Sequence, residues 1–83
     1  MKKLERDIIQ KLREKKLLQS DVSIDFRTSL VSSGLIDSFG LVEMLEIVEI
    51  VTGRRIPSGR ISPQDLDTVE SMIKVAHRWG KVV

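Results

Sequence analysis

Apolar side chains recur along this chain at three- and four-residue steps, and this spacing limits the fold more than any other feature. Leu4, Ile8 and Leu12 follow the step near the N-terminus, with charged, helix-forming residues between them. Side chains at this spacing share one face of an α-helix, and that face needs a partner surface to cover it. The pattern predicts a first helix over about residues 2–18.

The most hydrophobic helix is expected to run from Asp37 to Thr52. Gly53 follows it as a C-cap, because glycine readily adopts the left-handed conformation that ends many helices. Five apolar residues of this segment fall in one narrow arc and are expected to face the core: Leu41, Met44, Leu45, Val48 and Val51.

Two further helix starts follow. Ser62 and Pro63 have the pattern of an N-cap and a first helical position, which predicts a short helix. Asp67, with Glu70 three residues later, has the pattern of an N-cap for a last helix that ends before Gly80. The sequence therefore predicts an all-α fold: a small four-helix bundle, with three longer helices and one short third helix.

Residues 19–37 are predicted to form a long connection after the first helix. The connection holds too many apolar side chains for a free linker, so it is expected to lie against the core or to carry function. Val22, Ile24 and Phe26 alternate, which is also the pattern of a short strand, although no partner strand is evident. At 83 residues the chain has room for one core only, so a single domain over residues 1–83 is expected.

Composition excludes several classes of protein. No apolar run reaches about eighteen residues, so a membrane span is not expected, and a cytoplasmic location follows by default. The chain has no cysteine, which excludes a disulfide scaffold, Cys-ligated zinc and a thiolate nucleophile of its own. With His77 as the sole histidine, no metal site is expected.

The charges are segregated along the chain. The net charge of +2 is the sum of +4 over residues 1–18, −5 over residues 19–53 and +3 over residues 54–83. Nucleic-acid binding is not expected from the basic ends, because their cations alternate with acids and no aromatic platform accompanies them. The acidic middle contains the most informative residues.

Asp37 and Ser38 stand where the long connection meets the start of the second long helix. Backbone N–H groups lack partners there and the helix dipole is positive, so a phosphate carried by Ser38 would be well placed. The same pair is also an ordinary helix N-cap. A catalytic serine is a third interpretation, but no Gly-x-Ser-x-Gly elbow surrounds Ser38 and His77 lies on the last helix.

The side of this helix opposite its core arc mixes apolar and acidic residues: Phe39, Val42, Glu43, Glu46 and Ile50, with Glu49 at its edge. A purely solvated face is not expected to carry Phe, Val and Ile. The mixture indicates a docking surface for basic partners. The alternative is that Phe39 and Ile50 pack under the long connection or the short helix.

The segment Gly34–Phe39, Gly-Leu-Ile-Asp-Ser-Phe, resembles the phosphopantetheine-attachment region of acyl and peptidyl carrier proteins. Element order and spacing are similar from about Ile8 to Ala76. Ile56-Pro57 and the segment Asp65–Val69 (Asp-Leu-Asp-Thr-Val) match further positions at the family's spacing.

The resemblance implies that a phosphopantetheinyl transferase joins 4'-phosphopantetheine from coenzyme A to the hydroxyl of Ser38. The thiol of the arm would carry an acyl or aminoacyl group as a thioester, and the protein itself would not be an enzyme. Asp37 matches the acidic residue before the attachment serine, where it would support the site. Four residues match the family's partner-binding positions: Phe39, Val42, Glu43 and Glu46.

The partners implied are the transferase, an acyl- or aminoacyl-loading ligase and downstream acyl-transfer enzymes. No nucleic acid and no membrane is expected as a partner, and the protein is expected to be a monomer. Some family members shelter the cargo between helices, and the matching lining here is Val42, Met44, Leu45 and Ile61.

The chain departs from bacterial fatty-acid carriers in its net charge of +2, and in Gly40 and Ile50, where those carriers often place acids. Phe39-Gly40 resembles instead the pattern of stand-alone carriers loaded by adenylate-forming ligases, including D-alanyl carriers. A specialised biosynthetic pathway is therefore expected. The alternative from another class is a helical protein–protein interaction module that binds non-covalently, without the arm.

Overall fold

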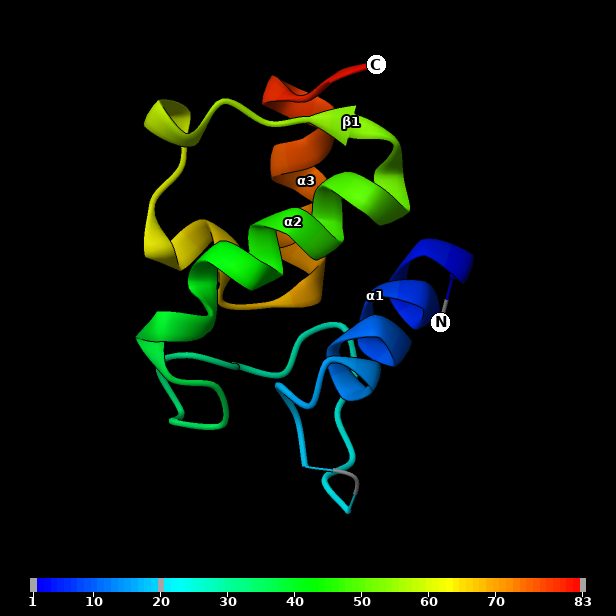
Figure 1. The fold of residues 1–83 in the computed structure, drawn as a ribbon, viewed down its shortest axis with the longest axis vertical. Helices are drawn as coiled ribbons and strands as arrows, with labels where there is room; N and C mark the ends of the chain where they lie inside the picture. Colours follow the sequence, from blue (N-terminus) through cyan, green and yellow to red (C-terminus); the bar gives the residue numbers. More distant parts are fainter. Residues whose placement is uncertain (1, 20, 83) are drawn as a thin grey trace.

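The computed structural model describes residues 2–19 and 21–82 and is built mainly of helices (Figure 1). The α-helices of the described residues are α1 (Lys3–Glu14), α2 (Leu41–Thr52) and α3 (Val69–Trp79). Short 3-10 turns form η1 (Ser38–Gly40), η2 (Ser58–Arg60) and η3 (Pro63–Leu66), and β1 (Arg54–Arg55) and β2 (Lys81–Val82) are two-residue strands. The predicted helical class is confirmed, with this small pair of strands added to it. None of the described helices has the length and apolar character needed to cross a bilayer.

The three α-helices pack against one another around one core. Its helical residues are Ile8, Ile9, Leu12, Met44, Ile47, Val48, Val69, Met72, Val75 and Ala76. The buried face of α2 differs from the predicted arc, because Ile47 is buried while Leu41, Leu45 and Val51 are only partly buried. The core therefore meets α2 on its Ile47 side, and the Leu41 side is left for a groove described below.

α1 ends at Glu14, earlier than the predicted end near residue 18. Lys16 has a φ of 61°, in the left-handed region. The Lys16 N–H donates to the Arg13 carbonyl at 3.0 Å, and the Leu17 N–H donates to the Leu12 carbonyl at 3.0 Å. This pair of bonds is the Schellman motif, in which glycine usually occupies the left-handed position. The turn ends the helix although the sequence carries no glycine to signal it.

Replacement of Lys16 with glycine is expected to stabilise the protein by about 1 kcal/mol, because a side chain in the left-handed region costs about 1–2 kcal/mol and glycine's flexibility offsets part of the gain. Lys16→Ala is the matched control, since it removes the amine and keeps the Cβ. Urea denaturation measures both. A glycine variant no more stable than the alanine variant would show that Lys16 is not strained.

The connection between α1 and η1 contains no strand in its described part, so the alternation of Val22, Ile24 and Phe26 does not form one. The connection packs on the core, as expected, through buried Ile24, Leu30 and Ile36. Its backbone is also held by α3. The Glu70 N–H donates to the Phe26 carbonyl at 2.9 Å.

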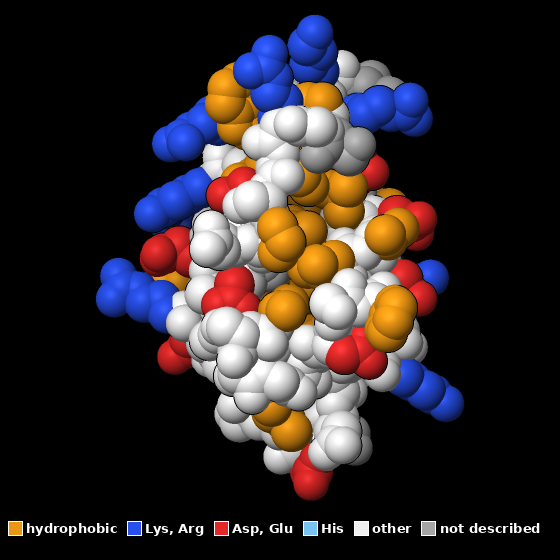
Figure 2. Space-filling model, turned by 90° about the vertical axis from the view of Figure 1, so that its left-hand side faces the viewer, with side chains coloured by type: hydrophobic (Ala, Val, Ile, Leu, Met, Phe, Trp, Pro, Cys, Tyr) orange, Lys and Arg blue, Asp and Glu red, His pale blue; other side chains and the backbone are white. Residues whose placement is uncertain are grey.

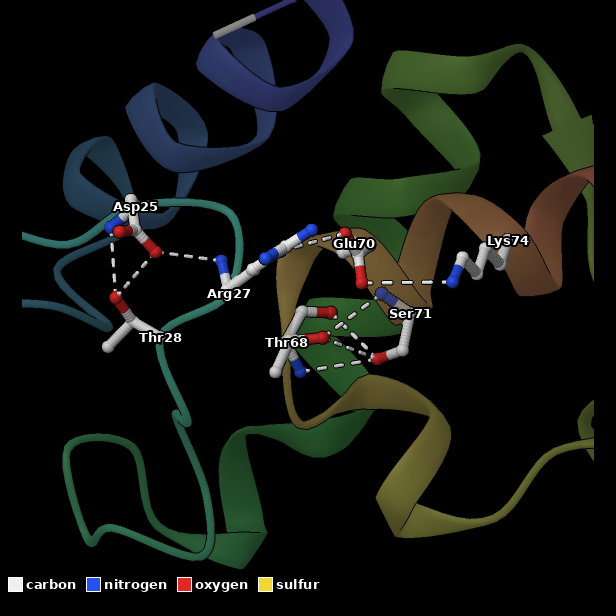
Figure 3. A network of polar contacts seen from close by, with 7 residues as sticks. All are labelled: Asp25, Arg27, Thr28, Thr68, Glu70, Ser71 and Lys74. Carbon is white, nitrogen blue, oxygen red and sulfur yellow. Dashed lines mark hydrogen bonds and ion pairs between the residues drawn. The ribbon is translucent and has the colours of Figure 1, made fainter.

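α3 begins with a capping box made by Thr68 and Ser71, and the predicted N-cap at Asp67 is wrong. The Thr68 hydroxyl accepts the Ser71 N–H at 3.0 Å, and the Ser71 hydroxyl accepts the Thr68 N–H at 3.3 Å (Figure 3). Glu70, the other half of the predicted pair, forms an ion pair of 3.4 Å with Arg27 of the connection (Figure 3). Glu70 therefore holds α3 to the connection.

β1 and β2 pair antiparallel, with Arg54 opposite Val82 and Arg55 opposite Lys81. The all-α prediction did not include this pairing, because a two-residue strand leaves no periodic pattern. Gly80 makes the pairing possible. A Cβ at this position would collide with the Ala76 carbonyl and lie 2.9 Å from the Arg54 Cβ.

Candidate functional site

Asp37 and Ser38 lie where the connection meets η1, one turn before α2 begins at Leu41. The Asp37 carboxylate accepts the Phe39 N–H at 3.0 Å, and the Asp37 carbonyl accepts the Gly40 N–H at 3.0 Å. Capping by Asp37 is confirmed, although it caps η1 and not α2 directly. The two bonds hold the turn on which Ser38 stands.

Ser38 is exposed, and its hydroxyl makes no hydrogen bond to any residue that the structure describes. The positive end of the α2 dipole lies just after it in the chain, where the N–H groups of Phe39 and Gly40 are bonded to Asp37 and that of Leu41 to the Ser38 carbonyl. The hydroxyl is therefore open to solvent, and no hydrogen bond with the described residues has to break before it can react.

Gly40 brings this turn close to the connection. It is buried, and a Cβ there would lie 2.8 Å from the Ile36 Cγ2 and 3.3 Å from the Leu17 Cδ2. In the sequence, Gly40 stands where fatty-acid carriers often place an acidic residue. The structure gives it a packing role, because a hydrogen as its only side chain lets η1 lie against Ile36.

The predicted docking face is exposed. The exposed fractions are 90% for Phe39, 67% for Val42 and 66% for Ile50, so these residues do not pack under the connection or the short turn. Glu43 and Glu46 are exposed as well. Glu49 differs from them. It is partly buried, and its carboxylate accepts the Ile56 N–H at 2.8 Å. Apolar and acidic groups thus lie together on one side of η1 and α2.

A shallow apolar groove runs between the first turns of α2 and the segment around η3. Its volume is about 200 Å³, and it is lined by Leu41, Val42, Leu45, Ile61, Ser62, Pro63 and Leu66. Three of the four predicted cargo-lining residues are in this set. The prediction for Met44 is wrong, because its side chain is fully buried in the core. Figure 2 shows hydrophobic side chains gathered over the middle of one face, with acidic side chains around them.

Asp67 ties the segment that leads to Ser38 to the start of α3. Its carboxylate accepts four hydrogen bonds: the N–H groups of Val31 (2.7 Å) and Ser32 (2.8 Å), and the hydroxyls of Ser29 and Ser32 (2.8 Å each). The Ser32 N–H, followed by the hydroxyls, lowers the pKa of the Asp67 carboxyl to about 2. The sequence reading missed this role. The signal for it was the Ser-rich stretch, which supplies hydroxyl donors.

The catalytic-serine interpretation gains no support from the structure. His77 lies on α3 and lines a separate cavity of about 670 Å³, with residues of α1, the connection and α3 but not Ser38. No hydrogen bond joins the two side chains. In the described ranges, no three His, Cys, Asp or Glu residues gather closely enough to hold a metal ion.

Comparisons of the chain with protein-family models, with curated proteins and with solved structures found no match. The residues and geometry of the chain itself are the basis for any functional assignment.

Proposed function

We propose that this protein is an acyl or aminoacyl carrier whose cargo is held as a thioester on a 4'-phosphopantetheine arm attached to Ser38. The observation that carries the proposal is the exposed, unbonded hydroxyl of Ser38 on a turn capped by Asp37, within the Gly34–Phe39 motif. The fold proposed with it is the carrier-type four-helix bundle, in which η3 serves as the short third helix.

The surroundings of Ser38 fit this group. A phosphodiester at this position would lie next to the N-terminal end of α2, where partial positive charge favours anions. The arm supplies a thiol, which the chain lacks because it has no cysteine. The groove lined by Leu41, Val42 and Leu45 begins directly after η1 and is apolar enough to shelter a short acyl group. The chain itself performs no catalysis in this proposal.

Intact mass spectrometry tests the proposal. The purified protein is incubated with coenzyme A, magnesium and a phosphopantetheinyl transferase that accepts many carriers. The expected result is a mass gain of one phosphopantetheinyl group, which peptide fragmentation places on Ser38. No gain with such a transferase would contradict the proposal.

The docking face gives a second prediction. Glu43→Lys combined with Glu46→Lys is expected to slow the transferase by about tenfold or more, because opposed charges guide association and like charges hinder it. The control is Gln19→Lys with Asp21→Lys, which raises the net charge by 3, against 4 for the pair on α2, at exposed residues of the connection. Initial rates of modification, measured at carrier concentrations below KM, give kcat/KM for each variant. Equal effects of the two pairs would show that net charge, not the face, controls recognition.

The remaining partners in this proposal are an acyl- or aminoacyl-loading ligase of the adenylate-forming kind and downstream acyl-transfer enzymes. They would meet a monomeric carrier in the cytoplasm, in a specialised biosynthetic pathway. Phe39-Gly40 after the serine supports this choice over fatty-acid synthesis.

A non-covalent interaction module of the same fold is the second candidate. The 90% exposure of Phe39 favours it, because an exposed aromatic side chain could bind a partner with or without an arm. The mass test separates the two candidates, since the module would stay unmodified.

A further inference from the structure

Two basic segments far apart in the sequence meet at one end of the molecule. The pairing of β1 with β2 places Arg55 beside Lys81, and the Arg60 guanidinium lies 4.9 Å from the centre of the Trp79 ring. Arg54 donates a hydrogen bond of 3.2 Å to the Gly80 carbonyl. The basic end is defined by Arg54, Arg55, Arg60, Arg78 and Lys81. Figure 2 shows Lys and Arg side chains gathered at the top of the molecule.

The charge of the basic end is not neutralised by acids from its own segments. Residues 53–64 and 71–83 contain no Asp or Glu. Arg55, Arg60, Arg78 and Lys81 are all exposed. The acids in the groove beside β1 are Glu46 and Glu49 of α2, and neither forms an ion pair with Arg54 or Arg55. Against these two acids the basic end carries five cations. The basic end therefore presents a cluster of cations to solvent, and such a cluster attracts anionic partners.

Apolar side chains accompany these cations. Trp79 is 37% exposed and Val82 is 76% exposed, and both belong to the segment that carries Arg78 and Lys81. Cations beside an indole ring and an exposed aliphatic side chain have the composition of surfaces that bind the interface of anionic bilayers. We propose that the basic end binds the surface of membranes that contain anionic phospholipids, with Trp79 and Val82 at the lipid interface.

A nucleic acid is a less suitable partner for this surface. Single-stranded nucleic acids bind on aromatic faces where bases can stack. Trp79 is the sole aromatic residue of the basic end, and one face of its ring already carries Arg60. An exposed Val82 gains nothing from phosphates, whereas it gains from contact with lipid.

The basic end and Ser38 lie at opposite ends of α2. Ser38 precedes the helix and β1 follows it, and the twelve residues of α2 span about 18 Å. Figure 1 shows β1 and the C-terminus at one end of the molecule and the start of α2 well below them. A protein bound through the basic end would keep Ser38 in solution. This proposal departs from the expectation of no membrane partner, which rested on the absence of an apolar span, and surface binding needs no span.

The test uses the unmodified protein of 83 residues, so its outcome does not depend on the arm. Trp79 is the only tryptophan, and its fluorescence reports on the basic end directly. With vesicles of phosphatidylglycerol and phosphatidylcholine, the emission is expected to shift to shorter wavelength and the protein to co-sediment. Pure phosphatidylcholine vesicles should give neither effect, and 0.5 M salt should release the protein. Equal binding to both vesicles, or binding to neither, overturns the proposal.

Substitutions locate the surface. Arg55→Gln with Arg78→Gln is expected to lower the partition coefficient by about thirty-fold, the combined contribution of two cations at a membrane. The control is Lys15→Gln with Lys16→Gln, which removes two cations just after α1. This pair should change the partition coefficient less than about threefold. Circular dichroism checks that both variants are folded. Equal losses in the two pairs, or tighter binding to single-stranded DNA than to anionic vesicles, overturn the assignment of the basic end to lipid.

Discussion

Ser38→Ala is expected to abolish phosphopantetheinylation completely, with no mass gain even at long incubation with excess transferase. The reason is chemical, because the variant has no oxygen at this position to form the phosphodiester. The fold should be unaffected. The Ser38 side chain is exposed and makes no hydrogen bond within the described part of the chain, so the free energy of unfolding is expected to change by less than about 0.5 kcal/mol.

The matched control is Ser23→Ala. Ser23 is also an exposed serine of the connection, and its side chain makes no hydrogen bond with the residues that the structure describes. This variant should gain the full mass at the rate of the unsubstituted protein. Mass spectra and urea denaturation of the two variants therefore separate loss of the attachment atom from loss of the fold. A mass gain that persists in Ser38→Ala would place the arm on another residue.

The three α-helices could be predicted because their apolar side chains repeat with the helical period. Helix packing buries those side chains, so the pattern and the structure share one cause. The same holds for the exposure of Phe39 and Val42, which follows from their place opposite the core arc. The capped turn before α2 was visible in Asp37, whose short carboxylate suits backbone N–H groups.

The features that could not be predicted depend on contacts between distant residues. Asp67 has the local pattern of an N-cap, but its carboxylate is used by Val31 and Ser32 of the connection, and Thr68 caps α3 in its place. The end of α1 relies on Lys16 in a conformation that glycine normally signals. The basic end forms only when β1 meets β2. In each case a tertiary contact overrides a local preference.

Asp67→Ala is expected to lower the free energy of unfolding by about 2–4 kcal/mol, the largest stability effect of the substitutions proposed. It leaves the N–H groups of Val31 and Ser32 and the hydroxyls of Ser29 and Ser32 without their acceptor. For a domain of this size the loss corresponds to a fall in Tm of about 10–20 °C. Thermal and urea denaturation at pH 7 measure it. A loss below about 1 kcal/mol would show that the network contributes little.

Asp67→Asn separates the charge from the contacts. The amide oxygen can still accept from Val31 and Ser32, and the serine hydroxyls can turn to accept from the amide nitrogen, so a smaller loss is expected at pH 7. The pKa of the Asp67 carboxyl is about 2 in the folded protein, against a usual value of 3.8. Because the folded pKa is the lower one, ionisation of Asp67 stabilises the fold above about pH 4, and this contribution is lost as the pH falls toward 2.

The stability difference between the unsubstituted protein and Asp67→Asn should therefore shrink by up to about 2 kcal/mol between pH 5 and pH 2. The other carboxylates titrate in both proteins and cancel in the difference, so the change isolates Asp67. A difference that stays constant over this range would mean that the carboxylate does not hold the connection.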